Sequence, residues 1–574
     1  MRGTRWEHRW GYTDTYFEPN DDDSVTLVGE RYPLSGTRMY GFMPFARETL
    51  GVDLDPFDLK PAIDSDVPEP RRNEAFIEFL SERFGSHISF NPTDRLIHSH
   101  GQTISGEIYR VLYDRLERVV DVVVCPDNEQ DIEATIEKAV EFDVCIVPYG
   151  GGSNVSGALM IPLDETRMVV SMDLSRMNHL LHLDRENLTA TFEAGIMGSE
   201  LEERLSAEGF TSGHEPDSIE LSSLGGWIAT NSSGMKKNRY GNIEDIVERA
   251  TMLTPRGRIE LTSSFPRSSI GVDPTGFMFG SEGNLGIITK ATIRIHWAPE
   301  EKRFDSLLFH SVDDGIEFLA ELAREGTLPA SLRLVDNLQF RFGQALKGRA
   351  TGVHKLIAML QKLFVTRFLR FDPLRMVVAT VAAEGSRQEI NHEMRVMNRI
   401  ARKHRGFSAG GENGKQGYML TFAIAYIRDF LVSMHILGET FETTVPWSRI
   451  LPLTQAVDRR LSELALHFGI PGIPFLSYRV TQLYQTGVCI YFTLGLYLKG
   501  VDDPPGVLNS VEHSLRETIL EEGGSLSHHH GVGKIRKEFL SDRMSHTAAE
   551  TIRGLKSASD PKNIFGAGNG VFGL

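Results

Sequence analysis

Three consecutive histidines, His528, His529 and His530, lie between glycines near the C-terminal end of the chain. Imidazole titrates near neutral pH, so it can bind metal, carry protons or hold a phosphate. A metal needs converging ligands, whereas neighbours along an extended backbone point in different directions. No carboxylate–histidine pair at i, i+4 accompanies the three. We therefore expect no metal site, and we assign the histidines to proton transfer and phosphate binding.

Three further polar side chains stand in apolar stretches. Arg333 and Arg428 could bind a dianionic phosphate, since a guanidinium offers a rigid fork of donors. Pairing with Asp336 and Asp429 explains them equally well from the residues alone. Tyr491, on an expected strand, could donate or accept a proton, although its position by itself favours a core tyrosine.

A triple-glycine turn at residues 150–154 follows a buried strand. Glycines allow the backbone N–H groups to approach an anion closely, and a pyrophosphate is the natural ligand. The turn lacks the Gly-Lys-Ser/Thr of a Walker A loop and does not open a helix as a dinucleotide fingerprint would. A second glycine cluster at residues 280–286 strengthens the interpretation as a phosphate cradle.

The elements around these loops alternate between strand and helix. Residues 119–125 and 144–147 are predicted strands, and the helix between them is expected to begin after Asp127. A second helix is expected from Ser199 to Gly209. With 574 residues, two to four domains are expected. We predict a mostly helical N-terminal segment (1–90), a cofactor-binding domain (91–300), an α+β substrate domain (301–520) and a C-terminal segment with the histidines (521–574).

The bulk composition excludes several classes of protein. The net charge of −16 argues against nucleic acid as a partner, and Cys125, Cys145 and Cys489 lack the C-x-x-C spacing of zinc ligands. No apolar run approaches the ~18 residues of a membrane span, and neither a signal peptide nor a Ser-Lys-Leu ending is visible. A cytoplasmic or peripheral membrane protein is expected.

Residues 347–370 reverse the overall charge, with six basic side chains, no acidic one and interleaved leucines and phenylalanines. This pattern is typical of an amphipathic helix at a membrane surface. A helix that packs its apolar face on the substrate domain is the alternative.

The order of the motifs resembles a known superfamily. Pro-x-Gly-Gly-Gly-Ser-x-x-x-Gly at 148–157 precedes Pro-Asp-Ser at 216–218, the glycine block 225–234 and Gly-Ser-Glu-Gly-Asn-Leu-Gly-Ile-Ile-Thr at 280–289. Together they resemble the vanillyl-alcohol-oxidase-type flavoproteins. The resemblance implies an α+β fold in which a two-subdomain domain of the PCMH type binds FAD beneath a cap domain. No histidine or cysteine in the glycine loop suggests covalent attachment, so we expect non-covalent FAD.

Further stretches resemble one branch, the alkyldihydroxyacetonephosphate synthases, over nearly the whole chain. They include residues 214–218, 233–245, 329–337, 425–429, 438–447 and 489–492, and the triple histidine, where flavin oxidases usually have one. The resemblance implies a flavin-dependent, net non-redox exchange of the acyl chain of 1-acyl-dihydroxyacetone phosphate for a long-chain fatty alcohol. That exchange forms the ether bond of ether lipids. A FAD-dependent 2-hydroxy-acid (D-lactate or glycolate) dehydrogenase or oxidase is the alternative, and a non-catalytic lipid-binding flavoprotein is a third.

The resemblance also assigns site residues. It makes Tyr491 and the three histidines catalytic and places Arg333, Arg428, Thr444 and His214 at the substrate. Thr444 stands where the family has serine. The residues expected to contact FAD are Pro148, Tyr149, Gly150, Gly151, Gly152, Ser153, Asn154, Val155, Asp217, Ser218, Ser223, Gly225, Gly226, Thr230, Glu282, Gly283, Asn284, Leu285, Gly286, Ile287 and Ile288. A homodimer stays open, as does a peroxisomal location through an atypical signal.

Overall fold

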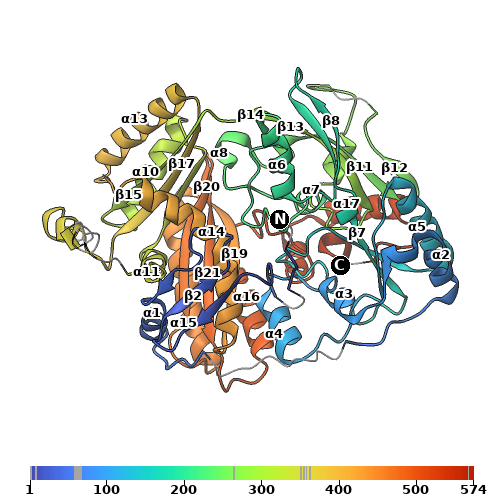
Figure 1. Ribbon diagram of the computed structural model, residues 1–574, viewed down its shortest axis with the longest axis horizontal. Helices are drawn as coiled ribbons and strands as arrows, with labels where there is room; N and C mark the ends of the chain where they lie inside the picture. The colour runs from blue at the N-terminus through green and yellow to red at the C-terminus, as the bar shows by residue number, and fades with distance from the viewer. Residues whose placement is uncertain are drawn as a thin grey trace.

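The computed structural model describes residues 3–6, 9–56, 67–262, 265–349, 352, 356, 359–360, 363–566 and 568–573. A large antiparallel sheet occupies the left of Figure 1, and two smaller sheets lie on the right. This arrangement agrees with the α+β class and the division into two subdomains and a cap that the sequence predicts.

The first subdomain is built on a four-stranded sheet of order β4-β5-β7-β6, in which β5, β7 and β6 are parallel. Its strands are β4 (Ile88–Ser89), β5 (Val122–Val124), β6 (Cys145–Tyr149) and β7 (Val169–Asp173). Helix α5 (Glu129–Phe142) begins at Asn128, one residue later than predicted, because the Asn128 side chain accepts the N–H of Asp131. The helix buries Ile132 and Ile136 in the same core as the sheet.

The second subdomain contains a five-stranded antiparallel sheet of order β12-β11-β13-β9-β8. Its strands are β8 (Leu180–Asp184), β9 (Thr189–Glu193), β11 (Val247–Thr254), β12 (Gly257–Ile259) and β13 (Ile287–Arg294). A small pair, β10 (Phe210–Thr211) and β14 (His296–Trp297), lies beside it. The helices are α6 (Gly198–Ala207), α7 (Leu224–Thr230), α8 (Lys237–Tyr240) and α9 (Ile243–Ile246).

The cap domain is a seven-stranded antiparallel sheet of order β18-β15-β17-β16-β20-β21-β19. Its strands are β15 (Glu301–Phe309), β16 (Ser331–Val335), β17 (Val377–Gly385), β18 (Phe407–Ser408), β19 (Ile436–Pro446), β20 (Phe475–Leu483) and β21 (Gly487–Tyr497). Its helices are α10 (Val312–Glu325), α11 (Asn337–Ala345), α13 (Arg387–Lys403), α14 (Gly411–Val432), α15 (Ile450–His467) and α16 (Pro504–Glu521).

The two faces of the cap sheet differ in character. Leu332, Leu334, Val480, Ile490 and Phe492 point to one face and form a single core with α10, α13, α15 and α16. Because side chains alternate along a strand, the residues between them point to the opposite face. That second face presents polar side chains toward the two subdomains.

The N-terminal segment contains helices, as predicted, and in addition a small sheet. Strands β1 (Tyr16–Pro19), β2 (Val25–Val28) and β3 (Arg38–Met39) form a sheet that shares a core with α1 (Phe42–Leu50) and α14. The β-branched Val25 and Val28 favour the strand. Helix α2 (Glu74–Phe84) instead packs in the core of the first subdomain, and α3 (Pro92–Ile97) and α4 (Ser105–Tyr113) follow it.

The C-terminal segment returns to the first subdomain. After α17 (His546–Ser559), Ile564 and Phe565 are buried in the core of that subdomain, and the Ile564 carbonyl accepts the N–H of Ile146 at 2.8 Å. Both chain ends therefore lie near the middle of Figure 1. Among the described residues, no helix combines the length and the apolar character that a membrane crossing requires.

Candidate active site

A cavity of about 410 Å³ lies between the glycine loops of the two subdomains and the second face of the cap sheet. Its lining combines three kinds of surface: glycine-rich backbone, polar side chains of β16, β20 and β21, and apolar side chains of α1, α11 and α14. Tyr491, His529, His530, Arg333 and Arg428 all reach it, so the fold brings these predicted residues together.

The glycine loop at 150–152 is packed too tightly for any side chain. A Cβ at Gly151 would lie 1.6 Å from the Leu221 carbonyl, and one at Gly150 would lie 2.3 Å from the Ser223 hydroxyl. Gly152 has φ of +68°, which favours glycine. The loop therefore requires glycine on steric grounds, and its backbone is free to line the cavity.

The cradle also contains buried polar atoms that could bind a ligand. Among the described residues, the Nδ2 of Asn154 and the hydroxyl of Ser281 are buried without a hydrogen-bond partner, and both residues line the cavity. Ser223 caps α7 and points the first turn of that helix at the same space. Donors converging on a helix N-terminus suit a pyrophosphate, so the residues present fit FAD.

Most residues predicted to contact FAD line the cavity, but three do not. Leu285 and Ile287 are buried in the hydrophobic cores of the second and first subdomains. Asn284 donates to the Ser281 carbonyl and accepts the N–H of Asn569, which anchors the C-terminal segment. These three side chains support the cradle from behind, which corrects their assignment as FAD contacts.

The histidine loop is held by two buried carboxylates. Glu442 on β19 accepts the N–H groups of His528 at 2.5 Å and His530 at 2.9 Å and the hydroxyl of Ser527 at 2.7 Å. Glu282, a predicted FAD contact, accepts the N–H of Gly533 at 2.9 Å and so fixes the other end of the loop.

The three histidine side chains point in different directions, as predicted, although one ring nitrogen of His528 lies close to one of His529. His529 and His530 reach the cavity, whereas His528 turns away and its Nε2 lies 2.6 Å from the hydroxyl of Tyr484. The Nδ1 atoms of His528 and His529, however, lie 2.8 Å apart. Burial lowers the pKa of His529 and His530 and lowers that of His528 to about 3, so all three are neutral near pH 7.

Tyr491 lies against these rings, with centroid distances of 6.0 Å to His529 and 5.2 Å to His530. Its hydroxyl donates to the Oγ1 of Thr440 at 3.0 Å, and burial raises its pKa to about 12. The neighbouring Glu439 also lines the cavity, and burial together with Glu512 raises its pKa to about 7. A phenol, neutral imidazoles and a carboxyl that titrates near neutrality therefore share one space.

Two arginines converge beside Tyr491. Arg333 and Arg479 each contact Asp217, at 3.3 and 3.1 Å, and the Arg479 guanidinium lies 4.4 Å from the centroid of the Tyr491 ring. The Nε of each arginine is buried without a partner among the described residues. Burial would raise the pKa of Asp217, but the two arginines hold it below its usual value. Asp217 therefore organises an anion site, in addition to lying near the expected cofactor.

The sequence offered Asp429 as the partner of Arg428, and the structure shows this ion pair. Arg428 contacts Asp429 at 3.0 Å and donates to the carbonyls of Gln102 and Thr103. It lies in the cavity wall, but these bonds use its donors to anchor the 102–103 loop. Arg333 does not pair with Asp336, which instead caps α11.

Two predicted substrate residues lie outside the cavity. His214 is buried behind it, 3.0 Å from the Ser232 hydroxyl and stacked edge-on against Trp227. Burial lowers its pKa to about 3. Thr444 pairs through its backbone N–H with the Ser525 hydroxyl and supports the histidine loop. Both assignments to substrate contact are therefore corrected to supporting positions.

Sequence reasoning missed Arg479, Glu442, Glu439 and Tyr484. Arg479 and Glu442 are charged side chains within strand stretches rich in β-branched and aromatic residues, which is the signal that singled out Arg333. Glu439 carries the same signal. Tyr484 has no such signal, because its bond to His528 depends on the path of a loop 44 residues away.

Comparison with known proteins agrees with this geometry. Residues 120–263 match the family model described as FAD binding domain, and residues 298–569 match that of the C-terminal domain of FAD linked oxidases. The chain is 41% identical to the alkyldihydroxyacetonephosphate synthase of Caenorhabditis elegans over 98% of this chain and 94% of that protein. It is 30% identical to that of Dictyostelium discoideum, over 87% of this chain and 81% of the relative.

A solved structure of alkyldihydroxyacetonephosphate synthase superposes with a TM-score of 0.85 at 26% identity. The superposition covers 98% of this chain and 96% of that one. The likeness therefore extends across both subdomains and the cap domain.

Proposed function

The chain belongs to the alkyldihydroxyacetonephosphate synthases, and we propose that the cavity described above carries out their exchange with its own residues in the roles that follow. The enzyme is a flavoprotein with FAD as cofactor. It converts 1-acyl-dihydroxyacetone phosphate and a long-chain alcohol to the alkyl ether and a free fatty acid. The observation that carries the residue roles is the meeting of an arginine pair, a tyrosine and neutral histidines in one cavity.

The arginine pair binds the phosphate. Arg333 and Arg479 hold one carboxylate, Asp217, between two positive charges, which leaves a net positive charge and two free buried Nε–H donors. Guanidinium groups match phosphate oxygens in geometry and charge. The phosphate bound there would lie beside Tyr491 and His529.

Tyr491, His529 and His530 move the protons. The exchange requires that a proton leaves and later returns at C1, and that the alcohol loses its proton as it adds. Imidazoles that burial keeps neutral can accept a proton, and the high pKa of the Tyr491 phenol keeps it a donor. Bound FAD supplies the nucleophile that lets one displacement proceed in two steps.

The apolar part of the cavity holds the hydrocarbon chain. Phe42, Phe45 and Leu50 of α1 line it with Phe342 of α11 and Phe475 of β20. A surface of this kind excludes water and favours each buried methylene by ~0.8 kcal/mol. The acyl and alkyl chains would occupy it in turn.

The reaction is tested by incubating the purified yellow protein with acyl-dihydroxyacetone phosphate and labelled hexadecanol, without an electron acceptor. Labelled ether product is the expected result. The FAD-dependent 2-hydroxy-acid dehydrogenase or oxidase is less well supported, since the 41% identity to a synthase spans 98% of the chain. Bleaching of the flavin by D-lactate or glycolate, with no ether product, would establish that alternative. Release of the flavin on acid denaturation tests non-covalent binding.

A second part of the proposal concerns the membrane. In the described part of segment 347–370, Leu356, Met359, Leu360, Leu363, Phe364 and Phe368 are exposed, and Phe368 reaches 75%. Lys355, Ile357 and Lys362 lie outside the described residues. The described part of the segment, in yellow, lies at the left edge of Figure 1. Phe364 contacts Phe407 of β18, with a ring-centroid distance of 6.2 Å. The other five side chains are each more than half exposed, which supports membrane docking over the alternative.

The position of this segment suits delivery of a lipid. Helix α11, which directly precedes it, places Phe342 in the apolar part of the cavity. We propose a peripheral membrane enzyme that takes both lipids from the bilayer at this segment. Sedimentation with vesicles and cell fractionation test the location, and light scattering tests the homodimer that the sequence left open.

A further inference from the structure

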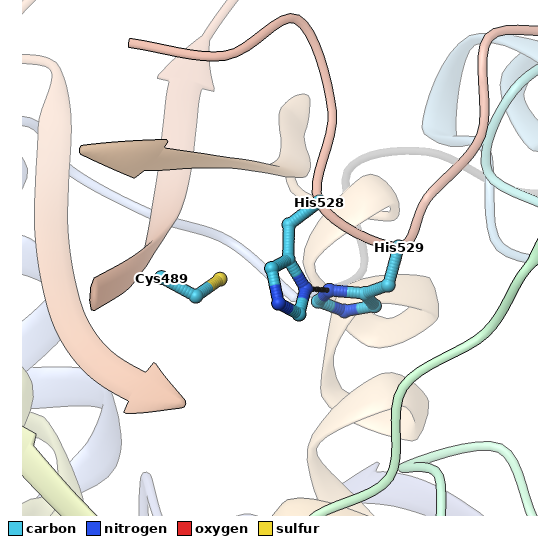
Figure 2. Close-up of side chains that lie close together, drawn as sticks. All are labelled: Cys489, His528 and His529. Atoms are coloured by element: carbon cyan, nitrogen blue, oxygen red, sulfur yellow. Dashed lines mark hydrogen bonds between the residues drawn. The ribbon is translucent and has the colours of Figure 1, made fainter. Parts of the chain in front are cut away.

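A thiol and two imidazoles meet beside the active site. Cys489 and Tyr491 point to the same face of β21, because they are two residues apart on one strand. The histidine loop crosses that face, and the ligand atoms of Cys489, His528 and His529 all lie within 4.8 Å of one another. Figure 2 shows the Cys489 sulfur directed toward the His528 ring, with His529 on its far side.

The hydrogen bond from Tyr484 gives an independent indication of ligand geometry. The Tyr484 hydroxyl lies 2.6 Å from the Nε2 of His528, and the Nδ1 on the other side of that ring faces His529. Metal-bound histidines use one ring nitrogen for the metal and the other for an orienting partner of this kind. The Nδ1–Nδ1 distance of 2.8 Å is that of a hydrogen bond, and the two nitrogens would have to separate to about 3.3 Å to share a tetrahedral metal at ~2.0 Å.

The chemistry of the cluster selects a particular class of ion. One sulfur and two nitrogens are ligands of zinc and similar thiophilic divalent cations, and a tetrahedral site retains one position for water. Cys489 is fully buried, whereas His529 lines the cavity and offers a path for entry. On binding, the thiol would release its proton to solvent. The proton between the two imidazoles would move to the Nε2 of the ring that carried it, so that both rings stay neutral and each gives its Nδ1 lone pair to the metal.

We propose that Cys489, His528 and His529 form an inhibitory site for a thiophilic divalent cation such as Zn²⁺. The bound ion coordinates the His529 ring, which lies against Tyr491, so His529 can no longer accept or donate a proton. Inhibition therefore rests on the proposed function of the histidine loop. Binding of the ion does not rest on it.

Binding is measured on the holoenzyme after chelator treatment, with Co²⁺ as a spectroscopic probe and Zn²⁺ in competition. One tetrahedral Co²⁺ per chain is expected to give d–d absorption between roughly 550 and 700 nm, beyond the flavin bands. Cys489→Ser should lose this absorption and bind Zn²⁺ at least ~100-fold more weakly. Cys125→Ser is the matched control, since the Cys125 thiol lies outside the cluster, and it should bind as the unmodified enzyme does.

Activity is measured in parallel. Stoichiometric Zn²⁺ should abolish ether formation in the unmodified enzyme and in Cys125→Ser, and a chelator should restore it. Cys489→Ser, checked for flavin content, should be active and resistant to Zn²⁺; Cys489→Ala serves if the serine variant misfolds.

Equal binding of the metal by Cys489→Ser and the unmodified enzyme, or no binding up to ~100 µM, would overturn the site. Binding without inhibition would overturn only the regulatory role, and a metal-free enzyme without ether formation would contradict the proposed function instead.

Discussion

At the residue scale, the site depends on two buried carboxylates, each of which is bonded to several donors. Glu442 holds three backbone N–H groups of the histidine loop, and Asp217 holds two arginines. A buried carboxylate is tolerated only where such partners surround it. These carboxylates therefore position the groups that we propose to act on the substrate.

Arg479→Met should raise the KM for acyl-dihydroxyacetone phosphate by ~10- to 100-fold, because one charged hydrogen bond is worth about 1.5–3 kcal/mol. Flavin content should not change, since Arg479 contacts Asp217 and Tyr491 rather than the glycine cradle. Steady-state kinetics with varied phosphate substrate provide the measurement. The exposed Arg459→Met is the control, and an unaltered KM in Arg479→Met would refute the role.

The histidine loop should make the protein sensitive to acid. Burial lowers the pKa of His528 from 6.5 to about 3, so below pH 6.5 the unfolded chain binds a proton that the folded protein excludes. Stability is therefore full above pH 6.5 and is lost as pH falls toward 3. His528→Asn should flatten the fall in Tm between pH 6.5 and 4, measured by calorimetry. The exposed His546→Asn should retain the unmodified slope, and identical slopes in both variants would contradict the assignment.

At the scale of elements, strand alternation decides which side chains meet the substrate. On β16, β20 and β21, leucine, valine and phenylalanine fill one core, and the intervening Arg333, Arg479 and Tyr491 line the cavity. A shift of register by one residue would exchange the two sets. The same alternation places Thr493 and Gly495 beyond Tyr491 in the cavity wall.

Gly495→Val should shorten the alcohols that the enzyme accepts. A Cβ at Gly495 would meet Phe475 at 3.4 Å and Ile436 at 3.9 Å, which is ordinary contact, and Gly495 lines the cavity, so we expect the methyls of valine to occupy part of its apolar space. Hexadecanol turnover should fall by ~10- to 30-fold and decanol turnover should change little, at ~0.8 kcal/mol per displaced methylene. Gly554→Val, on the exposed side of α17, is the control. An equal loss for both alcohols would argue against a role in chain length.

The segment 347–370 should lose membrane binding when its apolar surface becomes acidic. Leu360→Glu with Phe364→Glu removes two exposed apolar side chains and adds two negative charges. Binding to anionic vesicles should decrease more than ~10-fold in a sedimentation assay, with unchanged flavin content. Leu466→Glu, at an 86% exposed apolar position on α15, should bind normally. Unchanged vesicle binding by the double variant would rule out this docking surface.

At the scale of the whole molecule, a buried ionic network joins the second subdomain to the cap. Lys236 contacts Glu215 at 2.6 Å and Glu384 of β17 at 3.2 Å, and the hydroxyls of Tyr418 and Tyr240 donate to these carboxylates. Burial alone would lower the pKa of Lys236, but the two glutamates raise it. The network fixes the distance between the two walls of the cavity.

Lys236→Met should destabilise the protein by about 3–5 kcal/mol, because two buried carboxylates lose their common cation. Lys302 lies 3.6 Å from the same Glu384 but is 56% exposed, so Lys302→Met should cost less than about 1 kcal/mol. Denaturant unfolding followed by flavin fluorescence compares the two. Equal losses would show that the network does not hold the cap.

The sequence alone determined the glycine cradle, the family, the arginine in β16 and the tyrosine beside the histidines. These features are local: a tight turn requires glycine, and a charge within an apolar strand stands out wherever the strand folds. The lining of the cofactor cradle could therefore be predicted residue by residue, except at Asn284, Leu285 and Ile287, whose side chains do not line the cavity.

Only the tertiary structure decided which polar groups are neighbours. Asp217 meets Arg333 and Arg479 across 116 and 262 residues, and Cys489 comes to lie beside His528 through the path of a loop. His214 and Thr444, which the motifs placed at the substrate, instead lie behind it. Such meetings depend on the register of strands and the packing of domains, which are set by the sum of many distant contacts and not by any local pattern.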